Sequence, residues 1–168
     1  MAVTNDFSLG KVDVALTPRE RFEEFLQTRG KRTTRQRRVI VDHVCGRHEH
    51  FDAEQLLTDL RRTPEGAAAS RPTVYRTLTE MVDAGLLRKM TLGGRAVYEH
   101  DYGYPQHDHL HCTSCQRLIE FSSAELARIC DAVAGQHQFR ARGHRLIISG
   151  LCADCRSTRS KSRHQDRV

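Results

Sequence analysis

The chain has 168 residues and a formal net charge of +6, a length that suits one domain or two small ones. It lacks any run of about 18 apolar residues, and its first 16 residues have no continuous apolar core, so we expect a cytoplasmic protein without membrane span or secretory signal. The charge is uneven, because residues 17–98 hold 16 Lys and Arg against 11 Asp and Glu, whereas residues 99–155 hold 5 against 7. A basic first half followed by an acidic half rich in His and Cys suggests two separate tasks.

Capping residues predict two helices near the start of the chain. Thr17 is a suitable N-cap, Pro18 occupies the first helical position, and Gly30 would end the first helix. Thr33 or Thr34 would cap the second helix. The apolar stripe of this second helix comprises Val39, Ile40 and Val44.

Two further helices follow, separated by a loop. Asp52 and Gln55 form a capping pattern that starts a third helix, which turns three leucines inward: Leu56, Leu57 and Leu60. Pro and Gly residues predict a loop over residues 63–69. The fourth helix covers residues 71–82 and is closed by Gly85. Its spacing predicts one buried face, made of Val74, Leu78, Met81 and Val82.

Short apolar segments at 86–90 and 96–99 flank a Gly-Gly turn, which predicts a β-hairpin. Helices followed by such a hairpin are typical of a winged helix-turn-helix, with the fourth helix as the recognition helix and the hairpin as the wing. Tyr75 and Arg76 lie off the buried face of that helix, so their side chains would be available for contacts. The expected fold class is therefore α+β.

Residues 100–106 contain Gly and Pro and are expected to form a hinge. Beyond the hinge, strands are predicted at 109–112, 118–121 and 146–151. A helix over 124–137 carries an apolar stripe of Leu126, Ile129, Cys130 and Val133. The predicted organisation is a flexible extension, a winged-helix domain, a hinge, an α/β domain and a basic disordered tail, at residues 1–16, 17–99, 100–106, 107–155 and 156–168.

Four of the six cysteines form two C-x-x-C pairs, which are Cys112 with Cys115 and Cys152 with Cys155. In a reducing compartment such pairs indicate metal binding rather than disulfides, and four thiolates complete the tetrahedral shell of a structural Zn²⁺. Redox-active thiols are the alternative. The two remaining cysteines are interpreted as small buried hydrophobic residues, Cys45 and Cys130.

A second potential metal site involves histidines and carboxylates. His107 and His109 alternate along a predicted strand, so their side chains share a face. Such ligands suit Fe²⁺, Mn²⁺, Zn²⁺ or Ni²⁺. Candidates to complete this site are Glu99, Glu120 and His50.

Several motifs together resemble the ferric uptake regulator family over about residues 17–155. They are Thr73-Val74-Tyr75-Arg76-Thr77-Leu78, Gly85-Leu86, His107-Asp108-His109-Leu110-x-Cys112-x-x-Cys115, Ile119-Glu120-Phe121 and Cys152-x-x-Cys155, in that order. The resemblance implies a homodimeric, metal-dependent repressor that binds an AT-rich palindromic DNA operator, with metal as co-repressor. It also implies an N-terminal DNA-binding domain and a C-terminal α/β dimerisation domain with structural zinc.

The resemblance also implies residue roles. The four paired cysteines would bind the structural zinc. The regulatory metal, Fe²⁺ first and Mn²⁺ or Zn²⁺ otherwise, would be bound by His50, Glu99, His107, His109 and Glu120. The DNA contacts would be made in the minor groove by Arg32 and through the recognition helix by Tyr75 and Arg76. Peroxide-sensing members have Asp at the position of Glu120, so Glu here favours iron sensing, and zinc, manganese, nickel or peroxide sensing are the alternatives.

One departure concerns a third metal site found in some members of the family. Asp108 and His144 are present, but Gln106 and Ala127 occupy the other two positions. Glu125 lies two residues before Ala127 and would face another side of a regular helix. We therefore expect this third site to be incomplete or absent.

Two other classes of protein are possible. The pattern His107-x-His109-x-His111 is compatible with a zinc-dependent hydrolase, although no general base follows it. A zinc-stabilised adaptor that binds protein rather than DNA is the second possibility. Turnover of an ester or phosphate substrate would support the first, and indifference to DNA with every metal would support the second.

Overall fold

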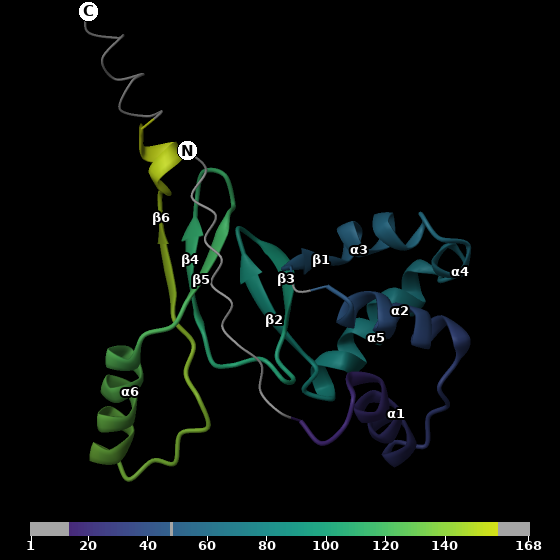
Figure 1. Ribbon diagram of the computed structural model, residues 1–168, viewed down its shortest axis with the longest axis horizontal. Coiled ribbons are helices and arrows are strands. Elements are labelled where there is room, and N and C mark those ends of the chain that lie inside the picture. The colour runs from purple at the N-terminus through teal and green to yellow at the C-terminus, as the bar shows by residue number, and fades with distance from the viewer. Residues whose placement is uncertain (1–13, 48, 158–168) are drawn as a thin grey trace, which may run out of the picture. The chain divides into compact units, whose positions relative to one another are not determined.

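The computed structural model describes residues 14–47 and 49–157, and the chain divides into two compact units between Tyr104 and Pro105 (Figure 1). We refer to residues 14–104 as the N-terminal unit and to residues 105–157 as the C-terminal unit. Most of the predicted N-terminal extension and nearly all of the basic tail lie outside the described residues. Within the described residues, no helix is both long and apolar enough to cross a membrane.

The N-terminal unit begins with the helices that the capping residues predict. Thr17 caps the first helix in a reciprocal capping box with Glu20, and Thr34 and Asp52 cap the second and third. The helices of this unit are α1 (Pro18–Thr28), α2 (Arg35–Cys45), α3 (Ala53–Leu60), α4 (Pro64–Ala67) and α5 (Arg71–Asp83).

The helical prediction misses one short helix and omits one buried residue. Residues 63–69 were expected to form a loop, but Thr63 caps the short helix α4 and Pro64 takes its first position, where a missing N–H costs nothing. In α2, the predicted apolar stripe does face the core, with Val39 partly buried against it, but the buried Val41 was not included in the prediction. Both errors arise because short elements and the edges of a buried face depend on tertiary contacts.

A three-stranded antiparallel sheet completes the N-terminal unit, with strand order β1-β3-β2. The predicted hairpin is confirmed as β2 (Leu87–Leu92) and β3 (Arg95–His100). Gly93 and Gly94 form its two-residue turn at φ 54° and 79°, a left-handed conformation that glycine adopts without steric cost. The third strand is the two-residue β1 (Phe51–Asp52), too short to leave a pattern in the sequence.

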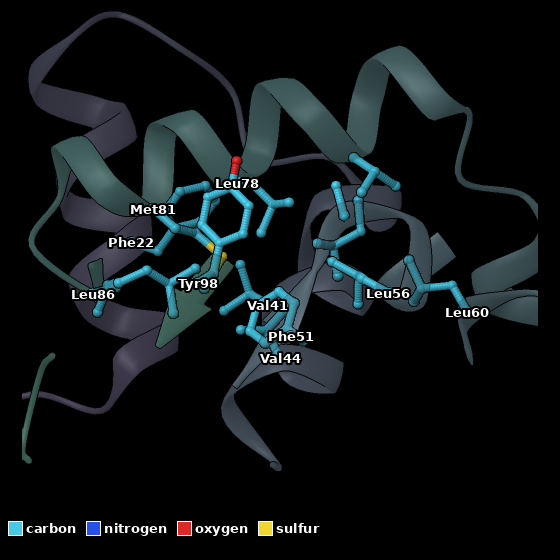
Figure 2. Packing of buried hydrophobic residues seen from close by; sticks show 14 of the residues in the cluster. Phe22, Val41, Val44, Phe51, Leu56, Leu60, Leu78, Met81, Leu86 and Tyr98 are labelled. Atoms are coloured by element: carbon cyan, nitrogen blue, oxygen red, sulfur yellow. The ribbon is translucent and has the colours of Figure 1, made fainter. Parts of the chain in front are cut away.

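The helices and the sheet enclose one apolar core. The buried face of α5 supplies Val74, Leu78 and Met81, all with no measurable exposure. Figure 2 shows Leu78 and Met81 beside Tyr98 of β3 and Phe22 of α1, with Val41 and Val44 of α2 nearby. The 3.6-residue period of α5 therefore fixes which of its side chains remain outside the core.

The C-terminal unit contains β4 (Asp108–Cys112), β5 (Leu118–Phe121), α6 (Ala124–Gln136) and β6 (Ile147–Gly150). Its sheet has the order β5-β4-β6, with β5 antiparallel and β6 parallel to β4. Figure 1 shows α6 beyond one end of this sheet rather than across its face. All of α6 is described, none of its residues is buried, and Ile129 and Val133 of its predicted apolar stripe are 59% and 50% exposed. The two units together confirm the α+β fold class.

Candidate functional site

The two C-x-x-C pairs lie at the same end of the C-terminal sheet. Cys112 ends β4, and its register partner Gly150 ends β6, only two residues before Cys152. The four sulfur atoms lie within 4.8 Å of one another, and those of Cys115 and Cys152 are 3.7 Å apart. Four ligands about 2.3 Å from a tetrahedral zinc ion would be about 3.8 Å apart. The arrangement therefore fits one zinc ion.

The charge distribution in this cluster also favours a cation. The backbone N–H groups of Cys115 and Cys152 point at the sulfur of Cys112 and lower the pKa of its thiol to about 5. The hydroxyl of Ser114 acts in the same direction on Cys155, but the neighbouring thiols of Cys152 and Cys115 outweigh it and raise the pKa of Cys155 to about 11. Four thiolates at this separation repel one another unless a cation compensates them.

A second cluster in the C-terminal unit combines two histidines with a carboxylate. His109 of β4 is the register partner of Glu120 of β5, and His107 lies two residues earlier on the same face. Their candidate ligand atoms lie within 4.8 Å of one another. Nδ1 of His107 is 2.9 Å from the carbonyl oxygen of Pro105, which can only accept, so the neutral ring presents Nε2 for metal binding.

The other two predicted ligands of this site lie together in the N-terminal unit. Glu99 is on β3, and His50 directly precedes β1, which pairs with β3. Nε2 of His50 is 3.1 Å from a carboxylate oxygen of Glu99, which is buried. His100 next to Glu99 instead contacts the carbonyl oxygen of Val44 at 3.0 Å. Two of the five predicted ligands therefore lie together in the N-terminal unit, and the other three lie together in the C-terminal unit.

The residues of the possible third site are engaged with each other. Nε2 of His144 is 3.0 Å from one oxygen of Asp108, and the other oxygen accepts the backbone N–H of Leu146 at 2.7 Å. The side-chain amide of Gln106 donates to the carbonyl oxygen of His144. Glu125 accepts from Ser123 at its own helix N-terminus, and among the described residues it belongs to neither cluster that could hold an ion.

The predicted DNA contacts are exposed on the N-terminal unit. Arg32 lies between α1 and α2, and Tyr75 and Arg76 lie on the side of α5 away from the core. The hydroxyl of Tyr75 donates to Glu54 at 2.7 Å, a hydrogen bond that raises the pKa of Tyr75. Arg71 pairs with the same carboxylate and lies over the Tyr75 ring at 5.7 Å.

Glu54 and Arg71 are not among the predicted site residues. A signal exists for Arg71, because residues four apart on a helix are neighbours, and Arg71 precedes Tyr75 by four. No local signal links Glu54 to Tyr75, which lie on different helices. His111, which prompted the hydrolase alternative, contacts the side-chain oxygen of Gln116 at 3.2 Å and is outside the His/Glu cluster.

Known proteins resemble this chain over most of its length. The model of the ferric uptake regulator family matches residues 28–149. The ferric uptake regulation protein of Rhizobium leguminosarum bv. viciae is 36% identical over 140 residues, which cover 83% of this chain and 94% of that protein. A zinc-bound manganese uptake regulator is 35% identical with a TM-score of 0.57, over 78% of this chain and 98% of that one. The Helicobacter pylori ferric uptake regulator shares the fold with a TM-score of 0.75 at 20% identity, over 88% and 97% of the two chains.

Proposed function

The chain belongs to the ferric uptake regulator family of metal-responsive, DNA-binding transcription regulators, which are not enzymes, and we propose that its two metal clusters have separate tasks. The four-cysteine cluster would hold a structural Zn²⁺. The His/Glu residues would hold a regulatory ion that controls affinity for an operator. Because the relatives named above are bacterial regulators, we propose that the protein acts in the cytoplasm.

The structural role of the cysteine cluster follows from its ligand set. Four protein thiolates leave no open position for a substrate or a water molecule on a tetrahedral zinc ion. Cys112 ends β4 and Cys115 follows it, while Cys152 and Cys155 follow β6, so a shared ion would connect the ends of two strands that lie far apart in the chain. The ion would therefore stabilise the C-terminal unit.

The observation that carries the regulatory role is the division of the other ligands between the units. His50 and Glu99 lie together in the N-terminal unit, and His107, His109 and Glu120 lie together in the C-terminal unit. We propose that these five residues share one ion across the segment 100–106. Metal binding would then favour one arrangement of the units, and DNA would select the same arrangement, so each would tighten the binding of the other.

We propose Fe²⁺ as the physiological ion and repression as the outcome, with the metal as co-repressor. Histidine and carboxylate ligands accept Fe²⁺, Mn²⁺ and Zn²⁺ without the softness that thiolates would impose. The name of the Rhizobium relative supports iron, and the name of the zinc-bound manganese uptake regulator supports the alternatives. Because Asp108 and His144 already engage each other and Glu125 is elsewhere, we propose two ions per protomer rather than three.

A homodimer would bring two recognition helices to a palindromic operator. An exposed apolar row supports this proposal: Leu110 of β4 pairs in register with Ile119 of β5 and Ile148 of β6, and Leu110 and Ile148 are 38% and 47% exposed. Ile129 and Val133 of α6 are exposed as well. A second copy of the C-terminal unit would cover such a surface.

The substitution Ile129→Asp on α6 tests the dimer. A charge in an apolar interface is costly, so the variant should be monomeric by light scattering at concentrations where the wild type is dimeric. Arg128→Ala, which changes an exposed neighbour, should remain dimeric. Both variants should retain zinc. A dimeric I129D protein would contradict the assignment of this surface.

The double substitution His107→Ala and His109→Ala tests the regulatory site. Fluorescence anisotropy on an AT-rich inverted repeat, without oxygen and at fixed salt, should show that Fe²⁺ tightens wild-type binding by roughly 5- to 150-fold. The double variant should bind equally with and without Fe²⁺ while keeping its zinc and its dimer. His137→Ala at the exposed end of α6 is the control. Loss of the dimer in the double variant, or an undiminished response to Fe²⁺, would overturn the separation of tasks.

A further inference from the structure

Glu80 on α5 carries a buried carboxylate to which the proposed function assigns no role. Glu80 follows Tyr75 by five residues on the same helix, and its side chain is only 5% exposed. An ionised carboxylate that is removed from water destabilises the fold unless cations and hydrogen bonds compensate it. The residues that form ion pairs with Glu80 therefore indicate its structural role.

Both cationic partners of Glu80 come from one short stretch of chain. Nζ of Lys31 lies 2.8 Å from the carboxylate, and a guanidinium nitrogen of Arg37 lies 3.0 Å from it. These two residues flank Arg32. Lys31 and Arg37 thus bind a carboxylate within the protein, whereas the side chain of Arg32 between them remains exposed.

Arg37 also holds the backbone of Arg32. While one nitrogen of its guanidinium pairs with Glu80, another donates to the carbonyl oxygen of Arg32 at 2.7 Å. The side chain of Arg37 is 13% exposed, so its position is well constrained by packing. A planar guanidinium can make these two directed interactions at once, whereas the single ammonium of lysine cannot reproduce them.

We propose that Glu80 and Arg37 are positioning residues that fix the backbone of Arg32 to the recognition helix α5. This inference rests on the proposed operator binding, in which α5 lies in the major groove and Arg32 reaches the minor groove. The sugar-phosphate backbone separates the two grooves by a distance set by the duplex, so Arg32 reads the minor groove best when its own distance from α5 is set in advance. Preorganisation of this kind reduces the conformational entropy that binding would otherwise cost.

If Arg37 positions Arg32, disrupting this interaction should affect recognition of the minor groove only. Loss of the Arg37–Arg32 interaction should weaken discrimination in the minor groove and leave contacts in the major groove unchanged. A general loss of fold would weaken both to the same extent. Modified bases separate the two effects. Replacing adenine by 2,6-diaminopurine adds an amino group only in the minor groove, and replacing thymine by uracil removes a methyl group only from the major groove.

The test uses full-length, metal-loaded protein and three forms of the AT-rich inverted repeat: unmodified, with diaminopurine in the flanks, and with uracil in the half-sites. Wild type should lose about tenfold in affinity on each modified duplex. Arg37→Lys keeps a positive charge beside Glu80 and should reduce the diaminopurine penalty to within about twofold, with the uracil penalty unchanged. Arg38→Lys is the matched control and should behave as wild type, since Arg38 pairs with Glu23 on the surface.

Two further variants complete the test. Arg32→Ala should remove the diaminopurine penalty by itself, and adding R37K to R32A should change the penalty no further. The Glu80→Gln protein should likewise bind the diaminopurine duplex and the unmodified duplex with nearly equal affinity, even if the melting temperature of this variant is lower than that of wild type. An R37K protein that keeps the full diaminopurine penalty, or that loses both penalties equally, would overturn the proposal. If wild type binds no duplex with any metal, the proposed function itself fails and this inference fails with it.

Discussion

The two units bury different kinds of side chain. The N-terminal unit encloses a continuous apolar core that includes Phe22, Leu26, Ile40 and Leu78, each at most 1% exposed. In described residues 105–157, the buried side chains are instead mostly polar: His107, Asp108, His109, His111 and Cys112. No large apolar residue of this described range is buried, and several are exposed, including Ile129, Val133 and Ile148.

This contrast indicates two sources of stability. Burial of apolar area stabilises a unit without help from any ligand, at about 25 cal/mol per Å². Buried histidines and thiols, by contrast, are compensated by metal ions or by each other. We therefore expect the N-terminal unit to fold by itself and the C-terminal unit to depend on zinc and on a second copy of the chain.

The largest expected effect comes from Cys152→Ser. Structural zinc in small domains contributes on the order of 10 kcal/mol to folding, so losing one of four ligands should unfold the C-terminal unit. The amide resonances of residues 105–157 should collapse in an NMR spectrum, and bound zinc should fall well below one ion per chain. Resonances of the N-terminal core should persist.

Cys130→Ser is the control for that experiment, because Cys130 is partly buried on α6 and outside the zinc cluster. This variant should keep its zinc and its full spectrum. Unfolding of both units in C152S, with the control intact, would show that the apolar core does not keep the N-terminal unit folded by itself.

A smaller effect is expected from Leu78→Ala in the middle of α5. Leu78 is fully buried, and removing its Cγ and two methyl groups should lower the free energy of unfolding of the N-terminal unit by about 2–5 kcal/mol. Urea unfolding followed by circular dichroism measures this change. The zinc content should stay at wild-type level, whereas its loss at low urea would mean that the units unfold together.

The smallest effect is expected from Glu54→Gln, which changes only the exposed side of the N-terminal unit. Glu54 accepts a hydrogen bond from Tyr75 and forms an ion pair with Arg71. Removing its negative charge should make both side chains more available to DNA and should remove the repulsion between this carboxylate and the DNA phosphates. Affinity for both operator and unrelated duplex should rise by about two- to fivefold at low salt. The iron dependence should remain that of wild type, and a changed iron dependence would contradict the independence of the two sites.

Local signals predicted most of the elements. These signals join residues that are close in the sequence, where spacing determines geometry. They are the helix caps at Thr17 and Asp52, the apolar period of α5 and the Gly-Gly turn. The strand β1 and the helix α4 were missed or misread because elements of two to four residues have no measurable period. Their formation depends on the strand or helix that packs against them.

The candidate metal ligands are predicted from sequence alone, because thiols and imidazoles at C-x-x-C and H-x-H spacing, with nearby carboxylates, restrict the possible chemistry in any fold. The sequence also indicated which face of α5 is buried. Three features are visible only in the folded chain: the parallel pairing of β4 with β6 brings the four cysteines together, Glu80 connects α5 to Lys31 and Arg37, and α6 exposes Ile129 and Val133. The first two features join residues about 40 or more positions apart, and the third depends on which parts of the chain cover α6. Local spacing in the sequence encodes neither long-range contacts nor surface exposure.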